Sequence, residues 1–239
     1  MREVQEFLKT HRNEWHPSSF LAQLDEPALN DLLSKGSLVR FAPGETLIEE
    51  GSSETDVLLL LSACVKVTAR LGPTSTALLA VRFAGDVVGE FAAVDGSERL
   101  ATVQACGLNP VYSARLSHES FSSVLAAFPG AERLLARTIV RKLRTATRRR
   151  IDYVGCTPLV RVARVLVELA DDFGQPVFSK GITIGVDLTK VELGTLIGGA
   201  EITANRALKV LRERGLIDTH GRRMIITNLE ALRSLAYGP

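Results

Sequence analysis

A helical repeat of apolar residues is clearest near the C-terminal end of the chain. Thr189 and Glu192 have the spacing of a capping box, which predicts that a helix begins at Lys190. Gly198-Gly199 ends this short helix. Its apolar stripe consists of Val191, Leu193, Leu196 and Ile197.

A second helix is predicted from about Glu201 to Gly215. Its inner face consists of Ala204, Ala207, Leu208, Val210 and Leu211. Its outer face consists of Glu201, Thr203, Asn205, Arg206, Lys209 and Arg212. Side chains of these kinds read base edges and phosphates in a major groove. Taken alone, the two helices fit an ordinary helical hairpin with a solvated outer face equally well.

The residues that follow favour the DNA-binding interpretation. Strand-forming residues at Leu216-Ile217 and at 224–227 flank the basic turn at 220–223, which predicts a β-hairpin wing with a basic tip. A helix-turn-helix with such a wing is a DNA-binding module, in which the second helix reads bases and the wing contacts phosphate. The candidate DNA-binding residues are Thr189, Glu201, Thr203, Asn205, Arg206, Lys209, Arg222 and Arg223.

In the first half of the chain, the apolar residues repeat with a different period. From Leu38 onward, short runs of strand-forming residues are separated by turn residues such as Pro43-Gly44. Many short strands at such spacing predict an all-β sandwich or barrel. Strands are expected at 39–41, 46–49, 57–61, 65–69, 76–83, 102–106 and 111–116. Short amphipathic helices are expected at 20–24, 28–33 and 117–128, after a polar extension at 1–15.

Residues 132–154 predict one long uninterrupted helix. Its apolar row consists of Leu135, Ile139, Leu143 and Ala146. That row is too narrow for a helix buried in a globular core and is typical of a coiled-coil seam between two subunits. Residues 155–158 interrupt the helix and predict a domain boundary. A further amphipathic helix at 159–172 and strand signals at 177–184 lead into the helix-turn-helix.

The net charge of +2 conceals an asymmetry along the chain. Residues 1–132 carry 10 basic against 17 acidic residues, whereas residues 133–150 carry 8 basic residues and no acidic one. Residues 158–239 carry 11 basic against 9 acidic residues. An acidic front part beside a basic second part is typical of a regulatory domain joined to a nucleic-acid-binding domain.

Several classes of function find no support in the residues. Cys64, Cys106 and Cys156 form no Cys-x-x-Cys pair and cannot supply four ligands to an iron–sulfur cluster, so buried thiols are the better interpretation. The four histidines lack zinc-ligand spacing, and no nucleophile–base pair indicates an enzyme. The longest apolar run, Val57–Leu61, is too short to span a bilayer, and no N-terminal signal is present. A cytoplasmic protein without membrane contact is therefore expected.

Five motifs follow one another in the order of a known family. They are Phe-x-Pro-Gly-Glu at 41–45, Glu-Gly at 50–51, Gly-Asp-x-x-Gly-Glu at 85–90, Glu-Arg-x-Ala at 98–101 and Asn-Arg-Ala-Leu-x-x-Leu-Arg-Glu-Arg-Gly-Leu-Ile at 205–217. With them, the chain resembles the cyclic-AMP receptor protein (CRP/FNR) family of bacterial transcription regulators over about residues 20–230. The resemblance implies an α+β fold with an N-terminal cyclic-nucleotide-binding-like β-barrel (jelly roll), a long dimerisation helix and a C-terminal winged helix-turn-helix. The expected domains are 1–131, 132–155 and 156–239.

The resemblance also implies an effector site, because in that family a Gly-Glu strand end and a following Arg form a phosphate-binding cassette. Glu90 would accept a hydrogen bond from a ribose 2′-OH, and Arg99 would pair with the cyclic phosphate. Backbone N–H groups at Phe91 and Ala92 would complete the cradle. The alternative is an inherited Glu–Arg pair that no longer binds a ligand. The candidate effector-binding residues are Glu90, Phe91, Ala92, Arg99, Leu100, Lys142, Ala146 and Thr147.

The chain departs from the family pattern at several positions. Leu100 replaces the usual Ser or Thr after the cassette Arg, and Ala146-Thr147 replaces the Thr-Ser pair that contacts adenine. Ala63 replaces a turn glycine. At 200–203, Ala-Glu-Ile-Thr replaces the common Ser-Arg-Glu-Thr, whereas Arg206 is retained. We therefore expect DNA binding to persist and cyclic-AMP binding to be weak or lost, with a cyclic nucleotide or cyclic dinucleotide as the candidate effector.

The sequence thus predicts a homodimer that binds a near-palindromic operator in double-stranded DNA, with RNA polymerase as a candidate further partner. An effector would shift the conformation of the paired long helices and set the two recognition helices about 34 Å, one DNA turn, apart. The alternative is an effector-responsive sensor of a cyclic nucleotide or cyclic dinucleotide that acts through a protein partner.

Overall fold

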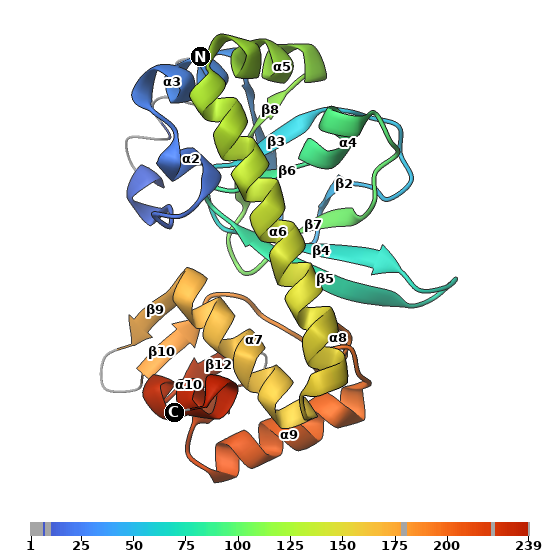
Figure 1. Ribbon diagram of the computed structural model, residues 1–239, viewed down its shortest axis with the longest axis vertical. Coiled ribbons are helices and arrows are strands. Elements are labelled where there is room, and N and C mark those ends of the chain that lie inside the picture. Colours follow the sequence, from blue (N-terminus) through green and yellow to red (C-terminus); the bar gives the residue numbers. More distant parts are fainter. Residues whose placement is uncertain (1–6, 8–10, 178–180, 221–222, 239) are drawn as a thin grey trace. The chain divides into compact units, whose positions relative to one another are not determined.

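The computed structural model describes residues 7, 11–177, 181–220 and 223–238 (Figure 1). The chain divides into two compact units, one of residues 1–76 and 80–142 and the other of residues 77–79 and 143–239. We call them the N-terminal unit and the C-terminal unit, and each has buried apolar residues of its own. Within the described ranges, no helix is both long enough and apolar enough to cross a bilayer.

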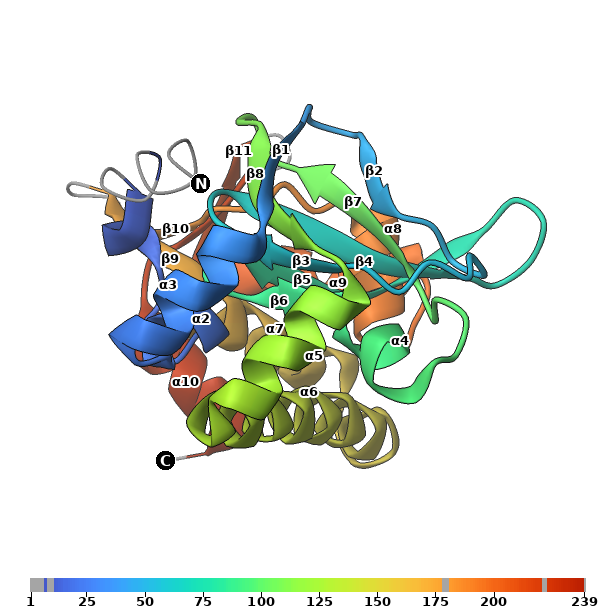
Figure 2. The same ribbon diagram turned by 90° about the horizontal axis from the view of Figure 1, so that it is seen from above.

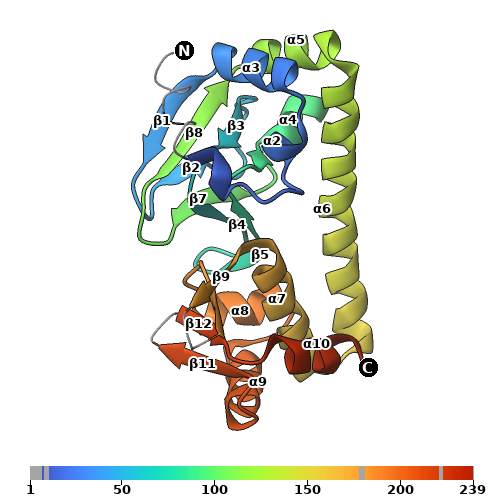
Figure 3. The same cartoon turned by 90° about the vertical axis from the view of Figure 1, so that its left-hand side faces the viewer.

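Two four-stranded sheets form the centre of the N-terminal unit (Figure 3). The first has the order β1 (Ser37–Phe41), β8 (Val111–Leu116), β3 (Val57–Leu60) and β6 (Val87–Val88). The second has the order β2 (Thr46–Ile48), β7 (Thr102–Cys106), β4 (Cys64–Arg70) and β5 (Thr76–Phe83). The expected strands are all present, and the short strand β6 is added to them. The predicted β-sandwich or barrel is therefore confirmed.

All four residues of strand β3 are buried. This explains why apolar and polar residues do not alternate along it. Val57 and Leu59 pack on the helices, whereas Leu58 and Leu60 pack between the two sheets, because successive side chains of a strand point to opposite faces. Each such leucine contributes about 1.5–3 kcal/mol by its burial. The helices that cover the first sheet are α2 (Phe20–Gln23), α3 (Glu26–Lys35), α5 (His118–Ala127) and the start of α6 (Pro129–Gly155) (Figure 2).

Two segments of the N-terminal unit differ from the sequence prediction. Trp15, expected in a polar extension, follows the short 3-10 helix η1 (Arg12–Glu14) and is buried. Its Nε1 donates a hydrogen bond to the carbonyl oxygen of Leu61 at 3.1 Å, so this residue belongs to the core. The residues after Gly89, which the sequence showed only as a motif, form the helix α4 (Glu90–Asp95).

The predicted apolar row of helix α6 is wrong at its first two positions, Leu135 and Ile139, which pack on the core of the N-terminal unit. Leu135 is buried in the core of the N-terminal unit, whereas Leu143 is 63% exposed. Adjacent residues lie about 100° apart around a helix, so Leu135 and Ile139 face the core whereas Ala136 and Val140 face away from it. The exposed positions with heptad spacing are Ala136, Val140, Leu143, Thr147 and Val154.

The C-terminal unit contains the expected winged helix-turn-helix. Its four strands pair in the order β11-β12-β10-β9. The last helix, α10, was not predicted from the sequence, and it packs against α7. In chain order the elements are α7 (Pro158–Phe173), β9 (Gly174–Val177), β10 (Gly181–Ile184), α8 (Lys190–Leu196), α9 (Glu201–Glu213), β11 (Ile217–His220), β12 (Arg223–Ile226) and α10 (Leu229–Tyr237). The two units together confirm the predicted α+β fold class.

Candidate nucleic-acid interface and effector site

Helix α8 begins with the capping box that the sequence predicts. The backbone N–H of Glu192 donates to the Thr189 hydroxyl oxygen at 3.1 Å, and the backbone N–H of Thr189 donates to the Glu192 carboxylate at 2.7 Å. Leu193 and Leu196 are buried as expected, but Val191 is 51% exposed. Its assignment to the inner stripe is wrong because residues two apart lie on nearly opposite sides of a helix.

The turn between α8 and α9 depends on two glycines. Gly198 has a φ of +67°, in the left-handed region that favours glycine. A Cβ atom at Gly194 would lie 2.9 Å from the carbonyl carbon of Ala200, so only glycine lets the turn approach α8 this closely. These contacts fix the direction in which α9 leaves the turn.

Helix α9 presents the predicted outer face to solvent. Its inner residues Ala204, Ala207, Leu208 and Leu211 are buried. Of the candidate DNA-binding residues on this helix, Glu201, Arg206 and Lys209 are exposed, and Thr203 and Asn205 are half-buried. The N-cap residue, Ala200, has extended backbone and makes no side-chain hydrogen bond, which agrees with the loss of the family's N-cap serine.

The charged residues of this face differ in how they are held. Asn205 Nδ2 donates to the Glu201 carboxylate at 3.4 Å, and Lys209 lies 3.7 Å from the carboxylate of Glu213 in an exposed pair. Such exposed pairs contribute little to stability. Among the described residues, Arg206 has neither a hydrogen bond nor an ion pair, and its guanidinium is therefore available to a partner.

The wing is joined to the recognition helix by a side-chain contact. Arg212, on α9, donates to the Thr219 hydroxyl on β11 at 3.0 Å, so this arginine braces the wing. Residues 217–220 pair with 223–226 across the hairpin. Arg223 is exposed, and Arg222 lies outside the described residues. The helix, the turn and the wing thus lie together in one unit, as a groove-reading module requires.

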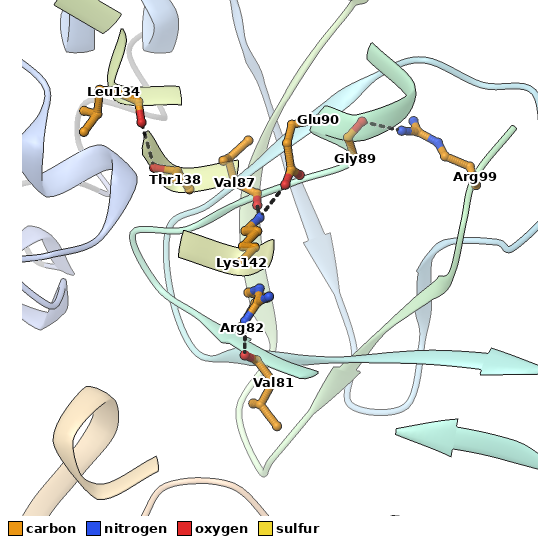
Figure 4. A network of polar contacts seen from close by, with 9 residues as sticks. All are labelled: Val81, Arg82, Val87, Gly89, Glu90, Arg99, Leu134, Thr138 and Lys142. Atoms are coloured by element: carbon orange, nitrogen blue, oxygen red, sulfur yellow. Dashed lines mark hydrogen bonds and ion pairs between the residues drawn. The ribbon is translucent and has the colours of Figure 1, made fainter. Parts of the chain in front are cut away.

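The candidate effector site is in the N-terminal unit and centres on Glu90, at the start of α4. Glu90 is buried, and its carboxylate accepts a hydrogen bond from the Lys142 ammonium at 2.6 Å (Figure 4). Lys142, on α6, also donates to the carbonyl oxygen of Val87 at 2.6 Å. The acidic residue expected to accept from a ribose is therefore already paired with a lysine of the same unit.

Arg99, the expected phosphate partner, is also held by the protein itself. It is 4% exposed, and its two terminal nitrogens donate to the carbonyl oxygens of Gly89 at 2.7 Å and Asp56 at 2.5 Å. Its Nε is buried and has no hydrogen-bond partner among the described residues. Gly89 makes this approach possible, because its φ is +86° and a Cβ atom there would lie 2.8 Å from the Arg99 nitrogen.

The electrostatics of the site follow from burial. Burial lowers the pKa of the Lys142 ammonium, while the carboxylate of Glu90 opposes this shift and the guanidinium of Arg82 adds to it. Figure 4 shows Arg82 beside Lys142. Burial also lowers the pKa of Arg99, and the carboxylates of Glu54, Asp56 and Glu90 oppose that shift. The arginine stays charged near neutral pH.

The other candidate effector residues are scattered. Phe91 and Leu100 are 39% and 69% exposed, and Ala92 is buried. Ala146 and Thr147 are exposed on the part of α6 that belongs to the C-terminal unit. The structure therefore brings together Glu90, Lys142 and Arg99 from the predicted set. Sequence reasoning missed the carbonyl acceptors of Val87, Gly89 and Asp56, for which no side chain gives a signal.

These contacts do not fit a cyclic nucleotide in the family's usual pose. A ribose hydroxyl would have to displace Lys142 from Glu90, which would leave an ammonium buried without its partner. A phosphate would have to compete with the two carbonyl oxygens that hold Arg99. Leu100, next to Arg99, offers an apolar side chain where a hydroxyl donor would be needed.

Comparison with protein families agrees with the two-part organisation. Residues 38–128 match the model of the cyclic nucleotide-binding domain, and residues 160–235 match the model of the Crp-like helix-turn-helix domain. A CRP-like cAMP-activated global transcriptional regulator of Mycobacterium tuberculosis is 28% identical over 194 residues, which cover 81% of this chain and 85% of the relative. The cAMP-activated global transcriptional regulator CRP of Haemophilus influenzae is 24% identical over 202 residues, which cover 84% of this chain and 88% of the relative.

Solved structures share the fold. A transcriptional regulator of the CRP family from Thermus thermophilus matches with a TM-score of 0.68 at 25% identity, over 83% of this chain and 96% of that chain. The c-di-GMP responsive global regulator CLP of Xanthomonas campestris matches with a TM-score of 0.69 at 20% identity, over 84% and 99% of the two chains. At 20% identity, the match to CLP shows only that the two proteins share a fold.

Proposed function

Because this chain belongs to the cyclic-AMP receptor protein (CRP/FNR) family of transcription regulators, we propose that it is a homodimeric regulator that binds a near-palindromic DNA operator without requiring cyclic AMP. The observation that carries the proposal is the recognition helix α9. It exposes Arg206, which has no partner among the described residues, beside a wing that Arg212 braces. An arginine in this position can pair with a guanine edge.

The test of DNA binding is selection of bound duplexes from a random pool, with and without cyclic AMP or a cyclic dinucleotide. We expect one near-palindromic sequence to be enriched in the absence of any nucleotide, with half-sites about one DNA turn apart. Enrichment that appears only with cyclic AMP would contradict the effector part of the proposal. No enrichment under any condition would contradict the DNA-binding part.

The dimer would form through the exposed row of α6. Val140, Leu143 and Val154 are 47%, 63% and 85% exposed, and apolar residues at heptad spacing on an exposed helix favour a partner helix. The double variant Val140→Asp/Leu143→Asp should be monomeric in light scattering, because it places charges in the seam. Arg148→Asp, which is exposed but lies outside this row, should remain dimeric. A dimeric double variant would contradict this interface.

We expect weak cyclic-AMP binding because Leu100 and Ala146 replace two residues that carry hydroxyl groups in the family pattern. Each hydrogen bond lost at Leu100 and Ala146 is worth about 0.5–3 kcal/mol, so two losses weaken binding by roughly one to four powers of ten. Calorimetry should therefore detect no sub-micromolar binding of cyclic AMP. Sub-micromolar affinity that Arg99→Ala abolishes, and that tightens DNA binding, would contradict the proposal.

A sensor that acts through a protein partner is the second candidate, supported by the match of residues 38–128 to the cyclic nucleotide-binding domain. The salt dependence of DNA binding separates the two candidates. A regulator that neutralises several phosphates loses affinity steeply as salt rises, with a slope of about −0.9 per phosphate contact on a double-logarithmic plot. A flat slope together with weak binding would favour the protein-partner alternative.

A further inference from the structure

Cys64 and Cys106, which look isolated in the sequence, lie against each other in the folded N-terminal unit. Cys64 begins β4 and Cys106 ends β7, and the two residues are direct partners in the antiparallel register of these strands. Their sulfur atoms are 3.1 Å apart. Both are buried thiols, as the sequence predicts, but they are neighbours in space, which the sequence does not show.

The strand register suits a cross-strand disulfide. Residues directly opposite each other in an antiparallel pair have Cα atoms about 4.5–5.5 Å apart, which lies within the range of about 4.4–6.8 Å found for disulfides. The register continues through Val65 with Ala105 and Lys66 with Gln104, so the sheet itself holds the two cysteines in place. A bond of about 2.05 Å needs the two sulfur atoms to approach by only about 1 Å more.

The surroundings of the pair contain no competing set of metal ligands and have a glycine beside one sulfur atom. Among the described residues, no group of three or more metal-ligating side chains is present. Each cysteine adjoins a residue with left-handed backbone, Ala63 at φ 56° and Gly107 at φ 90°. A Cβ atom added at Gly107 would lie 3.7 Å from the Cys64 sulfur, so no side chain presses on the sulfur from this direction.

We propose that Cys64 and Cys106 are an oxidant-responsive pair that forms a reversible disulfide within the N-terminal unit. The oxidant class is a small peroxide such as hydrogen peroxide. Cys106 is 8% exposed against 3% for Cys64, and its thiolate attacks one peroxide oxygen. The O–O bond breaks to give a sulfenic acid and hydroxide, which takes up the proton that the Cys106 thiol released and leaves as water. The Cys64 sulfur then attacks the sulfenic sulfur, and a second water leaves with the thiol proton. The two thiols lose two electrons, and the peroxide gains them.

This proposal does not rest on the proposed DNA binding. The bond would join β4 to β7 and close a loop of the chain between residues 64 and 106 in the unfolded state. Such a crosslink stabilises mainly by restricting the unfolded chain, and the effect grows with the length of the loop. The observable consequence is therefore a change in the thermal stability of the N-terminal unit.

The experiment uses the full chain, reduced and then treated with hydrogen peroxide. We expect the intact mass to fall by two hydrogen atoms, peptide mapping to join the Cys64 and Cys106 peptides, and dithiothreitol to reverse both changes. Mapping that finds the two peptides separate, or Cys156 crosslinked between chains instead, would overturn the proposal. This readout needs no variant, so a misfolded mutant cannot obscure it.

Variants then test the consequence of the bond. Oxidation should raise the Tm of the N-terminal unit by about 5–15 °C in the wild-type protein and in Cys156→Ala. In Cys64→Ala and Cys106→Ala the oxidised and reduced proteins should melt at the same temperature. An equal rise in either of these two variants would show that another modification causes the shift and would overturn the assignment.

Discussion

The effector site and the recognition helix carry similar charged residues but hold them in opposite ways. In the N-terminal unit, Glu90, Lys142 and Arg99 are buried or nearly so, and each is bound to a side chain or a carbonyl oxygen of the same unit. On α9, Arg206 and Lys209 are exposed, and the ion pair of Lys209 with Glu213 is long, at 3.7 Å. The first set is held by the fold, although the Nε of Arg99 has no partner among the described residues, and the second set is available to a partner.

The difference follows from the energetics of charge. A buried charge that loses its partner keeps the cost of leaving water, so buried charged groups become part of the structure. An exposed charge is already solvated and gives up little when it turns to a phosphate or a base. Family motifs do not distinguish these two situations, because the same residue types occur in both.

The largest expected effect is loss of the buried pair in the N-terminal unit. Lys142→Met removes the ammonium and leaves the Glu90 carboxylate buried without its ionic partner, so the free energy of unfolding should fall by about 3–5 kcal/mol. Urea unfolding followed by the fluorescence of Trp15, the single tryptophan of the chain, measures this in the right unit.

Two further variants make this test specific. Arg148→Met, an exposed change on the same helix, should alter the free energy of unfolding by no more than about 0.5 kcal/mol. The double variant Lys142→Met/Glu90→Leu should recover much of the loss, because no charge remains buried. If Lys142→Met unfolds like Arg148→Met, the pair is not part of the structure, and the comparison between the two regions fails.

The recognition helix should give the next largest effect, on binding and not on folding. Arg206→Ala should weaken binding to the preferred operator by about 1–3 kcal/mol and relax specificity at one position of each half-site. Urea unfolding should be almost unchanged, since Arg206 has no partner within the described chain. Fluorescence anisotropy with labelled duplexes measures the affinity.

Arg223→Ala is the matched control on the wing. As a phosphate contact, its loss should weaken preferred and random DNA by the same factor and reduce the salt slope by about one. Equal weakening of both duplexes by Arg206→Ala would instead mean that this arginine also binds phosphate.

Most of the fold could be predicted from the sequence, because the spacing of apolar residues indicates which side chains of a helix or strand are buried. Strand runs such as Val57–Leu61 and the capping box of Thr189 and Glu192 were correct, since each depends on neighbouring residues. Leu135 was placed on the wrong face, because α6 carries one apolar face for its own core and another, from Ala136, that is exposed. A single apolar pattern does not show which face the fold covers.

Contacts between residues far apart in the chain are what the sequence did not predict. Cys64 and Cys106 meet through strand pairing between residues 42 positions apart, which no spacing rule on a single chain detects. Lys142 was included as an effector residue, and the structure brings it to Glu90 as a partner within the fold. Family resemblance identified Glu90 and Arg99. It did not show that Glu90 pairs with Lys142 or that backbone carbonyl oxygens hold Arg99.

A smaller effect should come from restoring the helix cap of the recognition region. Ala200 has extended backbone with φ −88° and ψ 164°, the conformation in which a serine oxygen accepts from the N–H two or three residues on. Ala200→Ser should therefore raise the stability of α9 by about 0.5–2 kcal/mol. Hydrogen exchange of the first-turn amides of α9 measures it, and Ala200→Val, which lacks the oxygen, should give no gain.

The smallest effect is expected at Ala63 in the N-terminal unit, the one non-glycine among the described residues with a left-handed φ, 56°. This conformation costs an L-residue about 1–2 kcal/mol, and glycine avoids that cost. Glycine in turn lowers the free energy of unfolding by about 0.5–1 kcal/mol, because it makes the unfolded chain more flexible. Ala63→Gly should therefore raise the free energy of unfolding by about 0.5–1 kcal/mol, measured by Trp15 fluorescence in urea. Ala69→Gly, a few residues along in β4, should lower it by about as much. Equal losses in both variants would show that the backbone at Ala63 is not strained.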